Sequence, residues 1–183
     1  MIQEFTPPGF NLRRFMNSQS SRVWDLFFVD TDYQPMRPSV VAEQAQWRCC
    51  AKCQGLYFDG HATKGACPRG GAHGGLSVNY WLPQGSGGGQ PNWRWCKVCE
   101  GLFFAGNSSL GVCPNNPNGH DASQSGSYFL TQGAGPGQPN WRHCSACQGL
   151  FFAGAGSLGV CPKNPNGHDG SKSGNYFLPV TTG

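Results

Sequence analysis

The chain has 183 residues, of which 12% are charged and 28 are glycine, and its formal net charge is +4. Soluble domains contain roughly 25% charged residues, so the surface of this chain is expected to be polar but mostly neutral. Its 13 Lys and Arg residues are scattered, which excludes the clustered basic surface of a dedicated nucleic-acid-binding protein, and no apolar run approaches the ~20 residues of a membrane span.

Residues 1–43 precede the repeated part of the chain and are predicted to form an N-terminal arm. Their one strand-like apolar run, residues 23–29, cannot bury both faces alone and is expected to dock on the repeats or on another molecule. Residues 1–11 lack the basic and apolar segments of a secretory signal peptide. The chain is therefore expected to be cytoplasmic, to be exported by another route, or to be a mature form with an added Met.

From residue 44 onward the chain repeats itself three times. Each copy opens with Trp-Arg-x-Cys-x-x-Cys-x-Gly-Leu, and the opening residues are Trp47, Trp93 and Trp141. The period of about 47 residues lies in the range of tandem structural repeats. The predicted units are residues 44–84, 90–132 and 138–183.

Each repeat contains four short segments with the composition of β-strands and none with the period of an amphipathic helix. The first ends at the Trp-Arg pair, the second is Leu followed by two aromatic residues, the third enters the third cysteine, and the fourth is centred on a tyrosine. Clusters of Gly, Asn, Ser and Pro between them are typical of turns. These patterns predict an all-β chain.

Each repeat also carries three cysteines and one histidine in the order Cys-x2-Cys-x13-Cys-x5-His, or x6-His in repeats 2 and 3. Three thiolates and one imidazole form a closed tetrahedral zinc site, which stabilises a fold and has no open position for a substrate. In repeat 1 the shifted histidine leaves three thiolates and a water as an alternative. The predicted ligands of three zinc ions are Cys50, Cys53, Cys67 and His73, then Cys96, Cys99, Cys113 and His120, then Cys144, Cys147, Cys161 and His168.

Such ions would replace the hydrophobic core that a unit of this size cannot build. The predicted fold is therefore all-β, with three zinc-stapled, pseudo-symmetric modules, stacked or closed like a β-trefoil, plus the N-terminal arm. Disulfides are an alternative use of the ten cysteines, although three per repeat cannot pair within a repeat. Iron–sulfur or redox chemistry is a second alternative use of these cysteines. Cys49 is predicted to be a free thiol or half of a contact between chains.

Five further residues are candidates for ligand binding. Arg48, Arg94 and Arg142 recur beside the tryptophans and suit anion or sugar binding, or else they stack on aromatic neighbours and donate to loop carbonyls. Asp121 and Asp169 follow a predicted ligand histidine and are candidates for orienting its free ring nitrogen.

Two histidines, His61 and His143, have no counterpart in the other repeats and are predicted to be surface residues. The aromatic pair in each repeat is predicted to cover the Cys-x-x-Cys turn as part of the core. Binding of a ligand by these aromatic residues is the alternative.

These motifs resemble a tandem Trp-Arg-x-Cys-x-x-Cys-x-Gly-Leu-Phe-Phe module, completed by Cys-Pro and His, of bacterial and fungal proteins that are often extracellular or multi-domain. The resemblance extends over residues 44–178, and repeat 1 departs most, with Tyr57-Phe58-Asp59 in place of Phe-Phe-Ala. The activity of these modules is poorly defined, so the resemblance implies an extracellular context and little about function.

The sequence predicts a non-enzymatic binding module whose partner is a glycan or cell-surface polymer, because rigid repeated units suit weak multivalent binding. The alternative is a self-assembling filament, coat or sheath subunit that uses residues 1–43 for subunit contacts. An enzyme is not expected, since no acidic residue recurs in all three repeats and no nucleophile–base pair is recognisable. Composition favours an extracellular or surface location, with a cytoplasmic one as the alternative.

Overall fold

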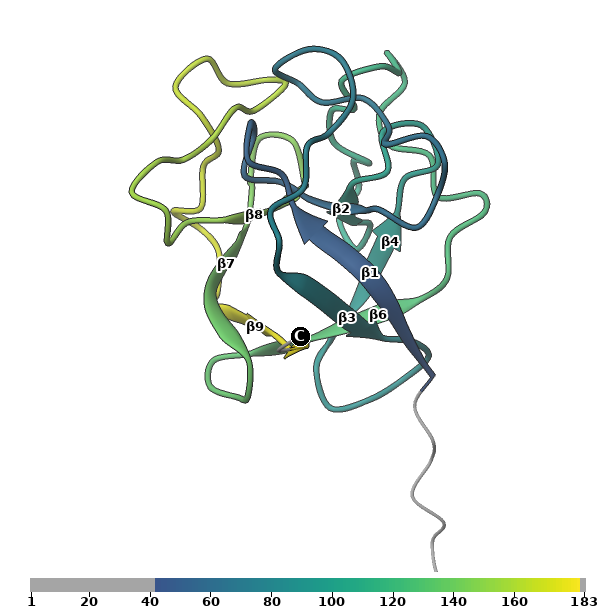
Figure 1. Ribbon diagram of the computed structural model, residues 1–183, viewed down its shortest axis with the longest axis vertical. Coiled ribbons are helices and arrows are strands. Elements are labelled where there is room, and N and C mark those ends of the chain that lie inside the picture. Colours follow the sequence, from purple (N-terminus) through teal and green to yellow (C-terminus); the bar gives the residue numbers. More distant parts are fainter. Residues whose placement is uncertain (1–41, 182–183) are drawn as a thin grey trace, which may run out of the picture. The chain divides into compact units, whose positions relative to one another are not determined.

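The computed structural model describes residues 42–181, and these residues form an all-β fold without a helix (Figure 1). The predicted all-β class with three similar modules is thereby confirmed. The strand predicted at residues 23–29 lies outside the described residues, so its docking and the self-assembly alternative stay predictions. Residues 42–181 contain no helix of the length and apolarity that crossing a bilayer requires.

Each repeat contributes three strands at matching positions, and a short tenth strand lies near the end of the last repeat. They are β1 (Glu43–Cys49), β2 (Leu56–Phe58), β3 (Asn79–Pro83), β4 (Gln90–Trp95), β5 (Leu102–Phe104), β6 (Tyr128–Gln132), β7 (Gln138–His143), β8 (Leu150–Phe152), β9 (Tyr176–Leu178) and β10 (Val180–Thr181).

The segment that enters the third cysteine was predicted to be a strand, and this prediction is wrong. Around Cys113 only an isolated bridge to Asn116 forms. The backbone groups of this segment bond elsewhere, since the Val112 N–H donates to the Cys147 carbonyl of the next repeat at 3.2 Å. A proline also follows the cysteine in every repeat and supplies no N–H to a ladder.

The first strand of each repeat pairs antiparallel with the second strand near one end and with the third near the other. In repeat 1, Trp47 lies opposite both Phe58 and Tyr80. A register shift just before the tryptophan, where Gln46 has a φ of 68°, bends the strand, as β-bulges do. The same bulge occurs in repeats 2 and 3, so all three tryptophans point into the same core.

The three repeats close into a ring. At one end, the third strands join them through the pairs Gln84 with Tyr128, Thr131 with Phe177, and Val180 with Tyr80. At the other end, the second strands meet the next repeat through Tyr57 with Gly101, Phe103 with Gly149, and Phe151 with Gly55. At both ends, every repeat pairs with both of the others. This arrangement is the predicted β-trefoil-like closure, and a linear array is excluded.

The core inside the ring is shared by all three repeats. Trp47, Trp93 and Trp141 are fully buried, and each meets the edge of a tyrosine from another repeat, with ring centroids 5.4, 5.2 and 5.1 Å apart. Such edge-to-face pairs contribute about 0.5–1.5 kcal/mol each beyond their area burial. Six leucines complete this core: Leu56, Leu82, Leu102, Leu130, Leu150 and Leu178.

Candidate metal centres

The four predicted ligands of each repeat lie together in one Cys3His group. Within each group the ligand atoms are within 4.8 Å of one another. All members are buried except His73, which is half-buried. The shorter loop of repeat 1 therefore still brings its histidine to the cluster. The groups are Cys50, Cys53, Cys67 and His73; Cys96, Cys99, Cys113 and His120; and Cys144, Cys147, Cys161 and His168.

The spacing of these atoms suits a tetrahedral ion. The Sγ atoms of the first and third cysteines are 4.0, 4.0 and 3.9 Å apart in repeats 1, 2 and 3. The Sγ of the second cysteine lies 3.6, 3.4 and 3.5 Å from the histidine Nδ1. Zn–S bonds of about 2.3 Å give a tetrahedron edge of about 3.8 Å. A disulfide needs about 2.05 Å, and all ten cysteines are free, so the disulfide alternative is wrong.

The Cys-x-x-Cys-x-Gly turn positions the first two thiols. In repeat 1 the Gln54 N–H donates to the Cys50 carbonyl at 2.8 Å, and the Cys50 N–H donates to Gly55 at 2.9 Å. The left-handed residue of the turn is Gln54, with a φ of 62°, and not the glycine. A Cβ on Gly55 would lie 3.4 Å from the Cys53 Sγ, which is van der Waals contact with the sulfur.

An aromatic ring holds each histidine in place. Tyr57, Phe103 and Phe151 stack on the histidine of their own repeat, with centroids 4.7, 4.6 and 4.7 Å apart and interplanar angles of 15°, 18° and 18°. All three rings are buried. The first member of the aromatic pair also packs with the three cysteines of its repeat, so the predicted covering of the Cys-x-x-Cys turn is confirmed for it. The second member packs in or against the shared core.

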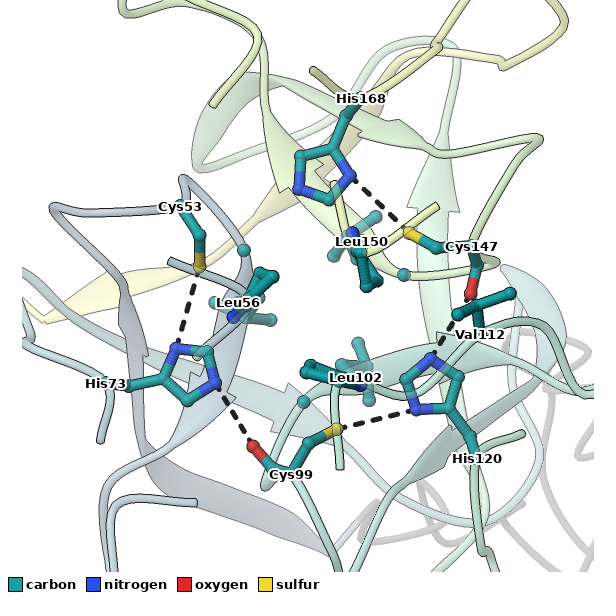
Figure 2. A pocket seen from close by; sticks show the side chains of 16 residues that line it. Cys53, Leu56, His73, Cys99, Leu102, Val112, His120, Cys147, Leu150 and His168 are labelled. Carbon is teal, nitrogen blue, oxygen red and sulfur yellow. Dashed lines mark hydrogen bonds between the residues drawn. The ribbon is translucent and has the colours of Figure 1, made fainter. Parts of the chain in front are cut away.

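The second ring nitrogen of the histidine reaches the next repeat. Nε2 of His73 lies 3.1 Å from the Cys99 carbonyl oxygen, and Nε2 of His120 lies 3.2 Å from that of Cys147 (Figure 2). A ligand histidine commonly donates its free N–H to such an acceptor, which fixes its tautomer. Each of these two contacts therefore joins one candidate metal centre to a ligand residue of the next.

Asp121 and Asp169 do not orient the histidines, so that prediction is wrong. Their backbone N–H groups donate to the thiols of Cys96 and Cys144, each at 3.3 Å. Their carboxylates accept the N–H of the serine two residues later, at 2.9 and 3.0 Å. Hydrogen bonds from neighbouring serines lower the pKa of both carboxyls. The two aspartates thus shape the loop around the cluster.

The surroundings of the first cysteine in each group favour its thiolate. Hydrogen bonds from neighbouring thiols lower the pKa of Cys50, Cys96 and Cys144, and burial acts in the opposite direction. The ligand histidine and a backbone N–H in each repeat lower it further. The same thiol contacts, together with burial, raise the pKa of the second cysteine of each group, Cys53, Cys99 and Cys147. The thiolate, which is the form that binds metal, is therefore favoured at the first cysteine and not at the second.

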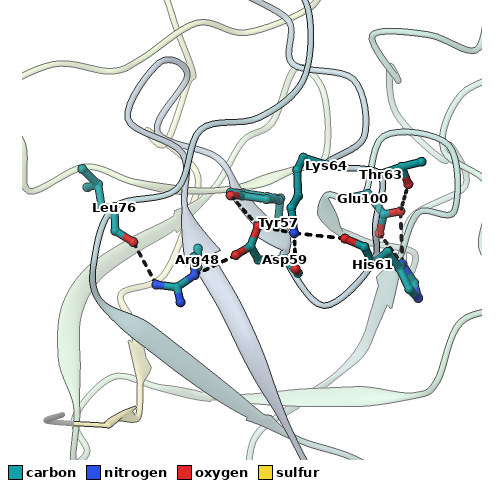
Figure 3. Close-up of polar contacts among 8 residues, drawn as sticks. All are labelled: Arg48, Tyr57, Asp59, His61, Thr63, Lys64, Leu76 and Glu100. Carbon is teal, nitrogen blue, oxygen red and sulfur yellow. Dashed lines mark hydrogen bonds and ion pairs between the residues drawn. The ribbon is translucent and has the colours of Figure 1, made fainter.

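The recurrent arginines make local contacts. The Arg48 guanidinium donates to Asp59 at 2.9 Å and to the Leu76 carbonyl at 3.1 Å (Figure 3), and Arg94 donates to the Trp93 carbonyl at 3.0 Å. Donation to carbonyls was the alternative to ligand binding. Arg142 makes no side-chain hydrogen bond within residues 42–181, and Gly170 packs against its stem. Ligand binding by these residues stays a prediction.

Cys49, His61 and His143 lie outside the three groups. Cys49 is 1% exposed, and its thiol lies 3.7 Å from the Gln54 carbonyl. Burial raises the pKa of Cys49 to about 12. It is thus the predicted free thiol, while a contact between chains is contradicted by its burial. The two histidines lie where repeats meet, His61 half exposed and His143 half-buried.

The three centres surround a small apolar cavity of about 50 Å³ (Figure 2). Leu56, Leu102 and Leu150 line it together with the three ligand histidines. Comparison of the chain with family models, curated proteins and solved structures gives no match.

Proposed function

We propose that this chain is a non-enzymatic binding module in which three zinc ions hold a closed β-ring together. The observation that supports it most directly is the presence of three complete sets of three thiols and one imidazole. This donor set suits Zn²⁺ better than hard cations such as Mg²⁺ or Ca²⁺. Four protein ligands leave no coordination position for water or substrate, so the ions would stabilise the fold.

Native mass spectrometry of gently purified protein tests the metal proposal. We expect three zinc ions per chain, and we expect chelation to unfold the domain, because the binding free energy of a structural zinc is largely folding free energy. A folded chain that carries no metal, or an iron–sulfur cluster in place of zinc, would contradict the proposal.

We further propose that the ligand is a glycan, displayed on a cell surface or in an extracellular polymer. The support is a surface of neutral polar groups, since only 12% of the residues are charged, on a rigid frame that costs little ordering entropy on binding. A glycan array probed with the zinc-loaded chain is the test. Binding to at least one class of glycan is expected, and a folded, metal-loaded protein without any hit would rule the ligand out.

A further inference from the structure

The three boundaries between repeats share one framework but differ in the side chains that fill it. Three equivalent sequence positions belong to each boundary: one lies in the loop after the second strand, and the other two lie at the end of the first strand and in the Cys-x-x-Cys turn of the next repeat. These three are His61, Trp95 and Glu100 at the boundary of repeats 1 and 2; Asn107, His143 and Gln148 between repeats 2 and 3; and Ala155, Cys49 and Gln54 between repeats 3 and 1.

The boundary between repeats 1 and 2 is filled by the chain itself. The His61 ring lies 4.9 Å from that of Phe58 and 5.1 Å from that of Trp95. Its Nδ1 is 2.9 Å from one carboxylate oxygen of Glu100, and Thr63 donates to the other (Figure 3). The Trp95 indole N–H donates to the oxygen that His61 contacts. The buried carboxylate therefore has protein partners and is not available to a ligand.

The boundary between repeats 2 and 3 is open. Asn107 takes the place of His61, and its amide donates to the Gln148 side-chain oxygen at 2.6 Å. The His143 Nε2 lies 2.9 Å from the same oxygen. Asn107 is shorter than histidine, and a cavity of about 420 Å³ lies here. This volume falls within the range of about 300–1,000 Å³ that small-molecule sites occupy.

The lining of this cavity offers hydrogen-bond donors and one positive charge. Gln132 and Lys172 line it, are exposed, and make no side-chain hydrogen bond or ion pair with other residues of 42–181. No carboxylate lines the cavity. The half-buried Phe104 ring forms part of the wall, 5.5 Å from the His143 ring. A fitting ligand has many oxygen acceptors, an apolar ring face and a negative charge.

We propose that this cavity binds one hexopyranose unit of a glycan and prefers a hexuronate, whose carboxylate would pair with Lys172. The inference rests on the proposed glycan binding and gives it a site and a chemical class. Hydroxyl groups would accept from Gln132 and Lys172 while the sugar's C–H face packs on Phe104. Because Lys172 is exposed, the preference over the neutral hexose is expected to be about threefold.

Saturation-transfer NMR of the full, metal-loaded chain with methyl hexosides and the matching methyl hexuronides tests the preference. A paired exchange, Lys172→Gln with Gln124→Lys, moves the charge to the equivalent position of repeat 2 and keeps the net charge constant. We expect the unchanged chain to favour a hexuronide about threefold and the exchanged chain to show no preference. A preference that survives the exchange would overturn the role of Lys172.

A second variant tests the site with the neutral methyl hexosides, which the carboxylate added by this variant does not repel. Asn107→His with Gln148→Glu transfers the filling pair of the first boundary into the cavity, and a dispersed amide spectrum shows whether it folds. We expect sugar binding to weaken about tenfold, the loss of roughly one well-formed contact. If binding is unchanged, the sugar binds elsewhere and this site is wrong while glycan binding stands. If no glycoside binds the unchanged chain, the glycan proposal itself fails.

Discussion

Two glycines with the same φ angle differ in what surrounds them. Gly111 and Gly156 both have a φ of 72°, in the left-handed region that costs other residues roughly 1–2 kcal/mol. A Cβ on Gly111 would lie closer than 3.0 Å to the Cys147 carbonyl of the next repeat, whereas a Cβ on Gly156 would meet nothing within 4 Å. A comparison of alanine substitutions at these two glycines therefore distinguishes the cost of backbone strain from the cost of disturbing the close packing between repeats.

We expect Gly156→Ala to lower the free energy of unfolding by about 1 kcal/mol, the cost of the left-handed conformation alone. Gly111→Ala should lower it by about 2 kcal/mol more, because the added methyl forces neighbouring backbone apart. Denaturant titrations of both variants at full metal loading measure the difference. Equal losses would show that the repeats are not packed as closely as this contact requires.

At the scale of the strands, a tyrosine hydroxyl from each third strand spans a boundary. Tyr80, Tyr128 and Tyr176 donate to the side-chain oxygens of Gln138, Gln44 and Gln90, which lie at the start of a first strand in another repeat. These bonds accompany the edge-to-face packing of the same tyrosines on the tryptophans. Each tyrosine thus contributes an apolar ring to the core and a polar contact to the ring closure.

Removing one of these hydroxyls is expected to cost about 1 kcal/mol of unfolding free energy, the usual net value of an intramolecular hydrogen bond. Tyr128→Phe is the test, measured by thermal or urea unfolding. Tyr57→Phe is the matched control, because repeats 2 and 3 already have phenylalanine there and Asp59 keeps its partners Arg48 and Lys64. A larger loss in the control than in Tyr128→Phe would contradict the role given to the closing tyrosines.

Local patterns predict the strands of this fold better than its closure. The first, second and fourth predicted segments are strands, because alternating or aromatic runs between turn residues are a local property. The segment before Cys113 fails because its N–H groups bond another repeat, which no local pattern reveals. Closure depends on contacts such as the hydrogen bond between Tyr128 and Gln44, which are separated by more than half of the repeated region. The spacing of residues in the sequence does not predict such a contact.

For the candidate metal centres, too, the sequence predicts the local feature, the ligands, better than the contacts between repeats. Spacing alone names the twelve residues that the structure gathers, because four ligands of one ion must lie close together in each repeat. Spacing does not reveal the acceptor of the histidine Nε2. The nearest polar residue in sequence, Asp121, is an obvious candidate, yet the Cys147 carbonyl takes that place. Contacts between repeats form only when the ring closes, so they cannot be predicted from the sequence of one repeat.

For the whole molecule, we expect ring closure to couple the three centres, although the Nε2 of His168 has no hydrogen-bond partner among residues 42–181. A histidine of repeat 1 contacts a ligand cysteine of repeat 2, and a histidine of repeat 2 contacts one of repeat 3. In repeat 3 the Val160 N–H donates to the Cys53 carbonyl at 3.2 Å, returning to repeat 1. An ion that orders one centre therefore also orders the acceptor used by its neighbour, which favours binding of the next ion.

Loss of one centre is accordingly expected to weaken the others. In Cys113→Ala, native mass spectra should show fewer than two zinc ions per chain at a chelator concentration that leaves three on the unchanged protein, because metal binding and folding are coupled. Cys49→Ser is the control, since that thiol is buried but belongs to no centre, and it should retain three. Two ions held at full affinity in Cys113→Ala would mean that the repeats bind metal independently despite the shared core.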